Sequence, residues 1–338
     1  MSKSLLLISF MAFYLSGCAS FEDLGSSLQD LSSSLKYNMQ GEYYLYQQDF
    51  KQGRDTFEQA ALTDPESPEA QYYYGRFLLA ENEEKIALPY LKQATVLKQD
   101  KSEYYFWLGV AYGESGQRTS ERKSYQKALD IEPNNIQALT YLGNNRLWAK
   151  KYKEALKYYR MALDLSYENP QALYNRAVAL RKLGRTKEEK LALLDYLNTY
   201  PSGSFSRLAT DRLNRLNDFT YRNYTLGYRT VTLAEISFLP SSGVLSETSF
   251  PSLDLLGETV ANMPKGTLQI IVYSLNNRNL AKKRAIRIRN YLTERFPDLE
   301  TNKRIRVSWF GTAEKRIVLK KTLRIKESVQ FFLSDFKD

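Results

Sequence analysis

Small and apolar residues recur at one constant spacing between residues 37 and 201. The first set consists of four glycines and one alanine, at Gly41, Gly75, Gly109, Gly143 and Ala177. Sixteen residues after each of them lies a large apolar or aromatic residue, at Phe57, Leu91, Tyr125, Tyr159 and Leu193. A third set follows the first by nineteen residues, at Ala60, Ala94, Ala128, Ala162 and Tyr196. Because small residues let two helices approach closely while the larger ones fill the space between them, the pattern predicts five packed helix pairs.

The spacing and the residue types resemble the tetratricopeptide repeat, a helix pair of about 34 residues. The resemblance implies a right-handed solenoid whose concave face binds a partner protein. On this phasing, six side chains of the first helices are candidates for the peptide groove: Tyr72, Arg76, Phe106, Asn144, Trp148 and Tyr174. Aromatic and Arg residues are typical interface anchors, but aromatic residues at helical spacing also pack between helices, so both interpretations stay open here.

The fifth repeat departs from the pattern, with Ala177 in place of Gly and Tyr196 in place of a small residue. Terminal repeats are often atypical because they contact a capping element. Residues 202–216 have the pattern of such a capping helix, with Leu208, Leu213 and Leu216 on its inner face. The repeats and their cap are therefore expected to occupy residues 37–216.

Residues 1–17 have the pattern of a secretory signal peptide, with Lys3 followed by an apolar core from residue 5 to residue 15. The segment ends in Leu15-Ser16-Gly17-Cys18, which resembles the lipobox of bacterial lipoproteins. The resemblance implies cleavage before Cys18, a covalent lipid such as palmitate on its thiol, and an anchored protein. Ala19 in place of Asp favours the outer membrane, with the body of the protein in the periplasm. The alternatives are an ordinary signal peptide, or a short anchor helix with an incidental Cys.

Residues 18–36 are rich in Ser but also carry Phe21, Leu24, Leu28, Leu31 and Leu35 at spacings of three and four. This spacing predicts a short helix after a tether, with one apolar stripe that packs on the first repeat. The alternative is that the stripe binds a helix of a partner protein.

The region after the cap changes character. Residues 217–230 lack a clear period and are expected to be a linker, whereas residues 231–338 alternate between strand and helix patterns. Strands are expected at 231–238, 268–273, 304–309 and 328–333, with a further one at 317–323, and helices at 252–263 and 279–296. The fold class is therefore an α-solenoid followed by a small α/β region with helices on a mixed sheet.

This last region resembles the OmpA-like C-terminal domain, a peptidoglycan-binding module of envelope proteins. The resemblance rests mainly on residues 277–292, NRNLAKKRAIRIRNYL, and on the turn FGTAE at residues 310–314. It implies that Arg284 is the family's ligand-binding Arg. Asn276 occupies the loop where the family has an Asp, so a neutral amide replaces the carboxylate that pairs with the ligand's ammonium group. The family's later N-R-R-V motif reads Lys326-Glu327-Ser328-Val329. Peptidoglycan binding is therefore an open question, and Arg284 bonded to a nearby carboxylate or carbonyl is the alternative.

Composition removes several kinds of chemistry. The chain has no His and one Cys, which excludes a Ser-His-Asp triad, an intrachain disulfide and a Cys/His metal site. An enzyme is therefore not expected, nor a cofactor other than the lipid on Cys18. The net charge of +10 lies mostly in the C-terminal third, and nucleic acid is not expected as the partner of an exported protein.

The sequence thus predicts a non-enzymatic scaffold lipoprotein of the envelope. Its repeats would bind a partner protein in the assembly of an envelope machine, of the secretion or pilus type. The alternative is a structural tether that joins the outer membrane to peptidoglycan through residues 231–338.

Overall fold

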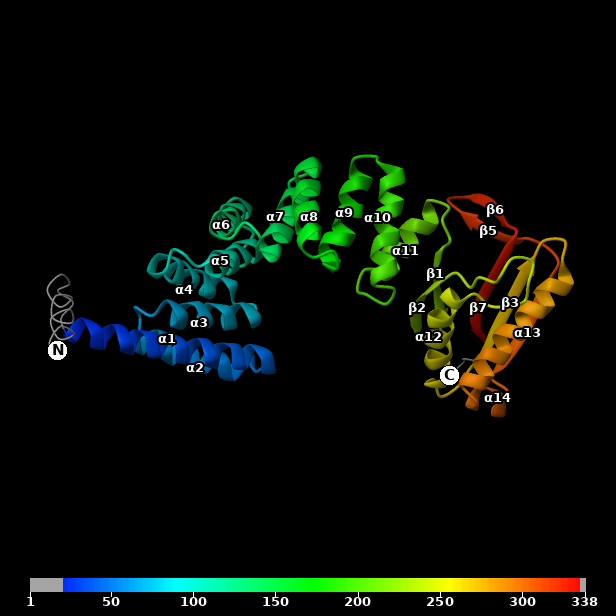
Figure 1. The fold of residues 1–338 in the computed structure, drawn as a ribbon, viewed down its shortest axis with the longest axis horizontal. Helices are drawn as coiled ribbons and strands as arrows, with labels where there is room; N and C mark the ends of the chain where they lie inside the picture. Colours follow the sequence, from blue (N-terminus) through cyan, green and yellow to red (C-terminus); the bar gives the residue numbers. More distant parts are fainter. Residues whose placement is uncertain (1–20, 335–338) are drawn as a thin grey trace, which may run out of the picture. The chain divides into compact units, whose positions relative to one another are not determined.

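The computed structural model describes residues 21–334 (Figure 1). The chain divides into two compact units, Met1–Asn145 and Arg146–Asp338. The division falls inside one helix, α7 (Ile136–Trp148). The predicted signal peptide, Cys18 and the start of the predicted tether lie outside the described residues. Among the described helices, none combines the length and the apolar character that a bilayer crossing requires.

The first unit is entirely helical over its described residues. Its elements before α7 are α1 (Phe21–Gln47), α2 (Phe50–Thr63), α3 (Pro68–Ala80), α4 (Glu84–Leu97), α5 (Ser102–Glu114) and α6 (Arg118–Ile131). The second unit continues with α8 (Tyr152–Leu165), α9 (Pro170–Lys182), α10 (Thr186–Thr199) and α11 (Ser206–Arg215). The helices α2, α4, α6, α8 and α10 begin at the constant spacing of the sequence pattern, as do α3, α5, α7 and α9. The predicted array of five helix pairs and a capping helix is therefore present.

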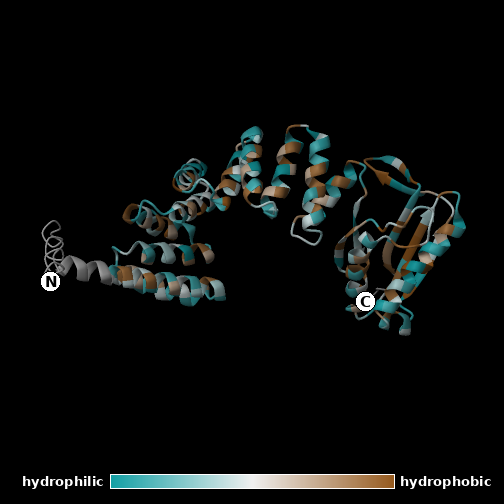
Figure 2. Ribbon diagram, in the orientation of Figure 1, coloured by the Kyte–Doolittle hydropathy of each residue, from teal (hydrophilic) through white to brown (hydrophobic). Residues whose placement is uncertain are grey.

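The positions that define the repeat lie in the core. Phe57, Leu91, Tyr125, Tyr159 and Leu193 are all at most 2% exposed. Gly75 and Gly109 bring a first helix against its own second helix: an added Cβ would lie 2.6 Å from Leu91 Cγ and 2.6 Å from Tyr125 Cδ1, respectively. Gly41 differs, because a Cβ there would collide with the Tyr73 ring of the next first helix. In Figure 2 the helices of the repeats carry both hydrophobic (brown) and hydrophilic (teal) residues, as expected for helices that bury one side.

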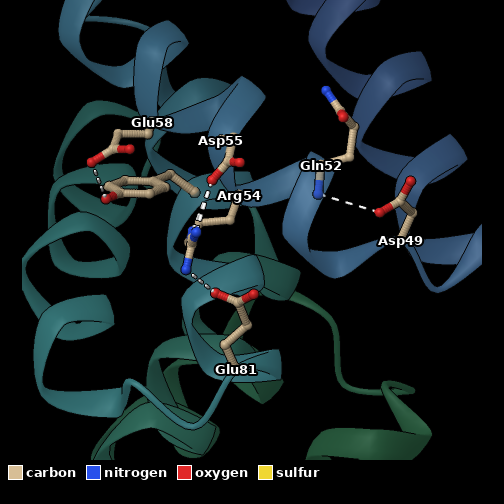
Figure 3. Close-up of polar contacts among 7 residues, drawn as sticks. Asp49, Gln52, Arg54, Asp55, Glu58 and Glu81 are labelled. Carbon is tan, nitrogen blue, oxygen red and sulfur yellow. Dashed lines mark hydrogen bonds and ion pairs between the residues drawn. The ribbon is translucent and has the colours of Figure 1, made fainter.

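Polar contacts fix where the helices begin and how they are joined (Figure 3). The Asp49 carboxylate caps α2 by accepting a hydrogen bond from the Gln52 backbone N–H at 3.3 Å. Arg54 of α2 donates to Asp55 at 2.9 Å and to Glu81, at the end of α3, at 2.6 Å. Ser67 and Asn169 cap α3 and α9 in the same way as Asp49 caps α2, and each precedes a Pro, which is favoured at the first helical position.

The N-terminal helix departs from the expectation. Residues 21–47 form one continuous helix, α1, so the short helix predicted within residues 18–36 is not separate from the first helix of the first repeat. Leu31 and Leu35 are 68% and 60% exposed, so their stripe does not pack on the first repeat as predicted. The opposite side of α1 packs on the next two helices: Tyr37 lies 6.0 Å from Phe57 of α2 and Tyr44 lies 6.4 Å from Phe77 of α3, between ring centroids.

The capping helix α11 closes the array at its C-terminal end. Leu213 is fully buried, but Leu208, which was predicted to face inward, is 50% exposed. The large Tyr196 is accommodated because its hydroxyl accepts a hydrogen bond from the Phe205 backbone N–H at 3.0 Å, just before α11. Arg212 of α11 forms a two-bond ion pair with the buried Glu189 of α10, at 2.5 and 2.8 Å.

The predicted linker at residues 217–230 is instead part of a hairpin. Strand β1 (Tyr221–Leu226) pairs antiparallel with β2 (Arg229–Ala234). The hairpin is attached to the cap, because Asn223 donates to the Arg207 carbonyl at 3.0 Å and to Asp211 at 2.8 Å. The alternating pattern of a strand was therefore hidden by the many Tyr, Arg and Asn residues of this segment.

A small mixed sheet follows. Strand β3 (Thr267–Ser274) lies between β4 (Ile305–Phe310), which runs parallel to it, and β7 (Glu327–Ser334), which runs antiparallel. Helices α12 (Phe250–Ala261) and α13 (Arg278–Arg295) contribute to the same apolar core, and the short η1 (Glu247–Ser249) and α14 (Asp298–Thr301) flank them. The single strand predicted at 317–323 is a hairpin of β5 (Glu314–Val318) and β6 (Lys321–Ile325), since Leu319 and Lys320 adopt positive φ angles at its turn.

The close approach at Gly109 gives a stability prediction. Gly109→Ala should lower the free energy of unfolding by about 1–3 kcal/mol, because the added Cβ displaces the buried Tyr125 ring. Helix propensity alone predicts the opposite, a gain of about 1 kcal/mol. The exposed Thr119→Ala is the control, and thermal unfolding of the purified chain is the measurement. A Gly109→Ala protein as stable as the parent would show that the repeats do not need this contact.

Candidate partner-binding surfaces

An Arg–aromatic cluster joins the first helices of two consecutive repeats, α3 and α5. The Tyr72 hydroxyl is hydrogen-bonded to the Glu103 carboxylate and accepts a hydrogen bond from Arg76 at 2.5 Å. The Arg76 guanidinium carbon lies 3.7 Å from the Trp107 ring centroid, a cation–π contact, and Arg76 also pairs with Glu103 at 3.4 Å. Burial raises the pKa of Tyr72 well above its usual range, and this effect is larger than the opposite effect of the nearby Arg76. The phenol therefore stays protonated.

Two of the candidate groove residues are core residues. Tyr72 is 1% exposed and stacks on Tyr104 at 4.5 Å between centroids. Phe106 is 3% exposed and packs against Trp107, Tyr125 and Tyr141 at 5.2–5.8 Å. Their rings therefore hold helices together and offer no open surface to a peptide, whereas Arg76 and Glu103 lie at the edge of the cluster.

The other candidate groove residues differ in exposure. Asn144 is half-buried and Trp148 is 72% exposed, both on α7. Tyr174 of α9 is half-buried and stacks on Phe205 at 4.5 Å with an interplanar angle of 3°. Tyr174 therefore supports the cap, and Trp148 is the one of the six candidates whose ring is mostly open to solvent.

Within the described part of the first unit, the most continuous exposed apolar surface lies on α1. Five large side chains lie at spacings of four, four, four and three: Leu31, Leu35, Met39, Tyr43 and Tyr46, exposed by 68%, 60%, 68%, 59% and 86%. We call this set the α1 face. Several of these residues, with Ser32, Lys36 and Gln40 beside them, line a shallow groove of about 660 Å³. The sequence pattern assigned Leu31 and Leu35 to an apolar stripe but did not point to Met39 and Tyr43, which belong to the same helical stripe.

Arg284 of α13 is held inside the C-terminal region by its own neighbours. It is 4% exposed, donates through Nε to the Ser242 carbonyl at 3.0 Å and through Nη1 to Glu327 Oε2 at 2.8 Å. Its guanidinium carbon lies 4.7 Å from the Phe238 ring centroid. The partners are thus the nearby carboxylate and carbonyl that the sequence left open as the alternative to a ligand.

Asn276, the second candidate for peptidoglycan binding, lies in the turn between β3 and α13. Its side chain is exposed, its φ is +61°, and its backbone N–H donates to the Gly311 carbonyl at 3.0 Å. The left-handed conformation is one that Asn tolerates better than most residues, so a turn requirement is sufficient to explain an Asn at this position.

A second buried ion pair stabilises the same region. Arg222 of β1 and Glu314 of β5 are 3.0 Å apart, with side chains 3% and 8% exposed. Glu314 also accepts a hydrogen bond from Gln330 at 2.9 Å, and Arg222 lies 5.3 Å from the Phe219 centroid. The pair joins segments 92 residues apart in the sequence, which no local pattern indicates.

Comparisons with known proteins identify the repeats. Residues 38–94 and 142–204 match one profile of the tetratricopeptide repeat, and residues 102–135 match a second. A curated relative is Protein O-mannosyl-transferase TMTC3 of Homo sapiens, 28% identical over 114 residues, which are 32% of this chain and 12% of that protein. The chain therefore matches only a small part of that relative's length.

Similar solved structures cover the helical part. That of pilF of Pseudomonas aeruginosa has a TM-score of 0.51 at 19% identity, over 56% of this chain and 86% of that one. That of YrrB, described as a TPR protein with an unusual peptide-binding site, has a TM-score of 0.44 at 15% identity, over 51% of this chain and 88% of that one. At 19% identity the likeness to pilF shows the fold alone. Together with the two profile matches, it supports tetratricopeptide repeats in the helical part of this chain.

The buried Arg222–Glu314 pair gives the second prediction. Arg222→Met should cost about 3 kcal/mol of unfolding free energy, because it leaves the Glu314 charge buried without its closest cationic partner. Arg222→Met with Glu314→Met should recover most of that loss. Arg295→Met is the matched control, since its pair with Asp254 is largely exposed and is worth less than about 1 kcal/mol. A double variant that is no more stable than Arg222→Met would contradict this account.

Proposed function

We propose that this protein is a non-enzymatic scaffold of a bacterial cell envelope. In this proposal a lipid on Cys18 holds it to the outer membrane, and its repeats bind a partner protein during assembly of an envelope machine of the secretion or pilus type. The repeats support the coarser part of the proposal, since arrays of this kind serve as protein-interaction scaffolds. The envelope location is supported by the signal peptide and lipobox pattern.

The observation that carries the binding proposal is the α1 face. Terminal repeats of a soluble array usually present a polar outer face. The α1 face instead exposes five large apolar or aromatic side chains, while the opposite side of the helix packs on the first repeat. A contiguous apolar patch with polar residues around it is typical of a protein-binding surface.

The shape of the α1 face indicates the kind of partner. Side chains at spacings of four and three form a single stripe along one helix, which suits a second helix laid beside it. The proposed occupant is therefore an apolar helical segment of a partner protein, packed over Leu35, Met39 and Tyr43. Covering each such side chain fully is worth about 1.5–3 kcal/mol, enough for the stripe to dominate the affinity.

The tether alternative receives less support. Peptidoglycan binding at Arg284 requires a guanidinium group that a ligand can reach. The Arg284 guanidinium already contacts Glu327, Ser242 and the Phe238 ring, and the residue is 4% exposed. The region of residues 231–338 is therefore proposed as a protein-docking domain of OmpA-like type, without a retained peptidoglycan site.

The α1 face gives the third prediction. Leu35→Asp with Met39→Asp should reduce the partner recovered with the protein from detergent-solubilised envelopes by at least tenfold, because binding would bury two carboxylates. Quantitative mass spectrometry of the co-purified proteins is the measurement. Leu62→Asp with Val96→Asp is the matched control, since these residues are 66% and 63% exposed but do not belong to the stripe.

Two outcomes would contradict the proposal. One is an unchanged set of co-purified proteins in the Leu35→Asp/Met39→Asp variant. The other is a wild-type protein that dimerises in size-exclusion chromatography, with a variant that becomes monomeric yet keeps every other partner. The second outcome would assign the α1 face to self-association.

The lipid anchor gives the fourth prediction. Several acyl chains, each contributing about 0.8 kcal/mol per buried CH₂, hold a protein firmly at a membrane. Cys18→Ala should therefore move the protein from the membrane pellet to the soluble fraction on cell fractionation and leave the signal peptide uncleaved before residue 18. A variant that is processed normally and stays in the outer membrane would contradict the anchor.

A further inference from the structure

A groove in the second unit runs between α8 and α10, the second helices of two consecutive repeats. The first helix between them, α9, contributes its floor through Arg176 and Leu180. The groove has a volume of about 450 Å³, and a second hollow of about 410 Å³ adjoins it and shares Arg176 and Asp195 with it. The tetratricopeptide resemblance pointed to the face of the first helices that carries Tyr174, so this surface is a different one.

One wall of the groove carries an excess of positive charge. Lys153, Lys157 and Arg160 follow one another along α8 at spacings of four and three, and all three are exposed. None of them forms an ion pair with a carboxylate within the described part of the chain. Because residues at these spacings lie on one side of a helix, the three cations point along the same edge.

The other charges of the groove are already paired. Arg176 bonds Asp195 at 2.5 Å, and Arg185 bonds Glu188 through both carboxylate oxygens. The groove lining thus holds five cations and two carboxylates, and the surplus is three positive charges, all on α8.

Apolar side chains lie between the charges. Leu156 of α8 is half-buried, Leu180 lies at the floor, and Leu191 of α10 is 62% exposed beside them. A surface with an apolar centre and a cationic edge matches a helix that has leucines on one side and carboxylates beside them. The two paired carboxylates and the concave form disfavour a flat, uniformly anionic surface such as a membrane.

We propose that this groove binds an acidic amphipathic helix of a partner protein. Its leucines contact Leu156, Leu180 and Leu191, and its carboxylates pair with Lys153, Lys157 and Arg160. Since α8 and α10 each have 14 residues, they are about 21 Å long at 1.5 Å per residue, and the proposed helix is one of similar length laid along them. The site is separate from the α1 face, so failure of either proposal leaves the other in place.

The test uses a fluorescein-labelled 16-residue helical peptide with leucines at i, i+3, i+4 spacing and glutamates beside them. Its binding to the full chain is measured by fluorescence anisotropy at 50 and 150 mM salt. A second peptide with lysine in place of each glutamate measures how far charge sign matters. Vesicles of phosphatidylglycerol are added as a competitor to ask whether lipid takes the site instead.

The expected result is binding of the glutamate peptide that weakens with salt and is absent for the lysine peptide. Lys153→Glu with Lys157→Glu should weaken it at least tenfold, and Leu191→Asp at least fivefold. The matched control is Lys51→Glu with Lys123→Glu, which makes the same change of net charge on exposed residues of α2 and α6. Circular dichroism confirms that each variant is folded.

Four results would overturn the proposal, and the first three concern binding of the peptides and the vesicles. They are equal losses in the groove and control variants, equal binding of the two peptides, or displacement of the peptide by vesicles that depends on Lys153 and Lys157. The last would assign the groove to an anionic lipid surface. An effect of the charge variants without one of Leu191→Asp would reduce the site to unspecific attraction and also count against it.

Discussion

The close contact between small residues of one helix and a large residue of the next is the constraint on which the helical part of this protein depends. At Gly75 and Gly109 there is no room for a Cβ beside Leu91 and Tyr125. This contact joins the two helices of the second and the third repeat, and each repeat can bury its apolar side only against a neighbour. The first and the last repeat each have one apolar side without a neighbouring repeat, and the chain treats these two sides differently. At the C-terminal end α11 covers the last repeat and pairs Arg212 with Glu189. At the N-terminal end α1 leaves an apolar face uncovered.

Charge is used in two different ways in the second unit. In the mixed-sheet region, Arg222 and Arg284 are almost fully buried and bonded to Glu314 and Glu327, respectively. Desolvated cations of this kind must be paired, so they serve the fold. On α8, by contrast, Lys153, Lys157 and Arg160 remain exposed beside an apolar floor. Exposed, same-sign charges next to leucines serve recognition better than stability.

The sequence predicted the repeats well because their signal is local and periodic. The second helix of each pair begins at a constant spacing from the second helix of the pair before it. The prediction failed where a segment is ordered by distant residues. Strand β1 was predicted to be part of a linker because the segment has many polar residues, such as Arg222 and Asn223. Arg222 is nevertheless buried, and it pairs with Glu314, 92 residues further along the chain. Likewise, the spacing placed Tyr72 and Phe106 on the correct helices, but only the packing of Tyr104, Trp107 and Tyr141 around them shows that they are core residues.

The central claim is that the repeats offer the α1 face to a partner protein. Its most direct test is photo-crosslinking in intact cells, with a photoreactive amino acid at Met39. The control position is Val96 of α4, which is similarly exposed but lies outside the α1 face. The account predicts a discrete adduct to one protein from position 39 and none from position 96. No adduct from position 39, or the same adducts from both positions, would contradict it.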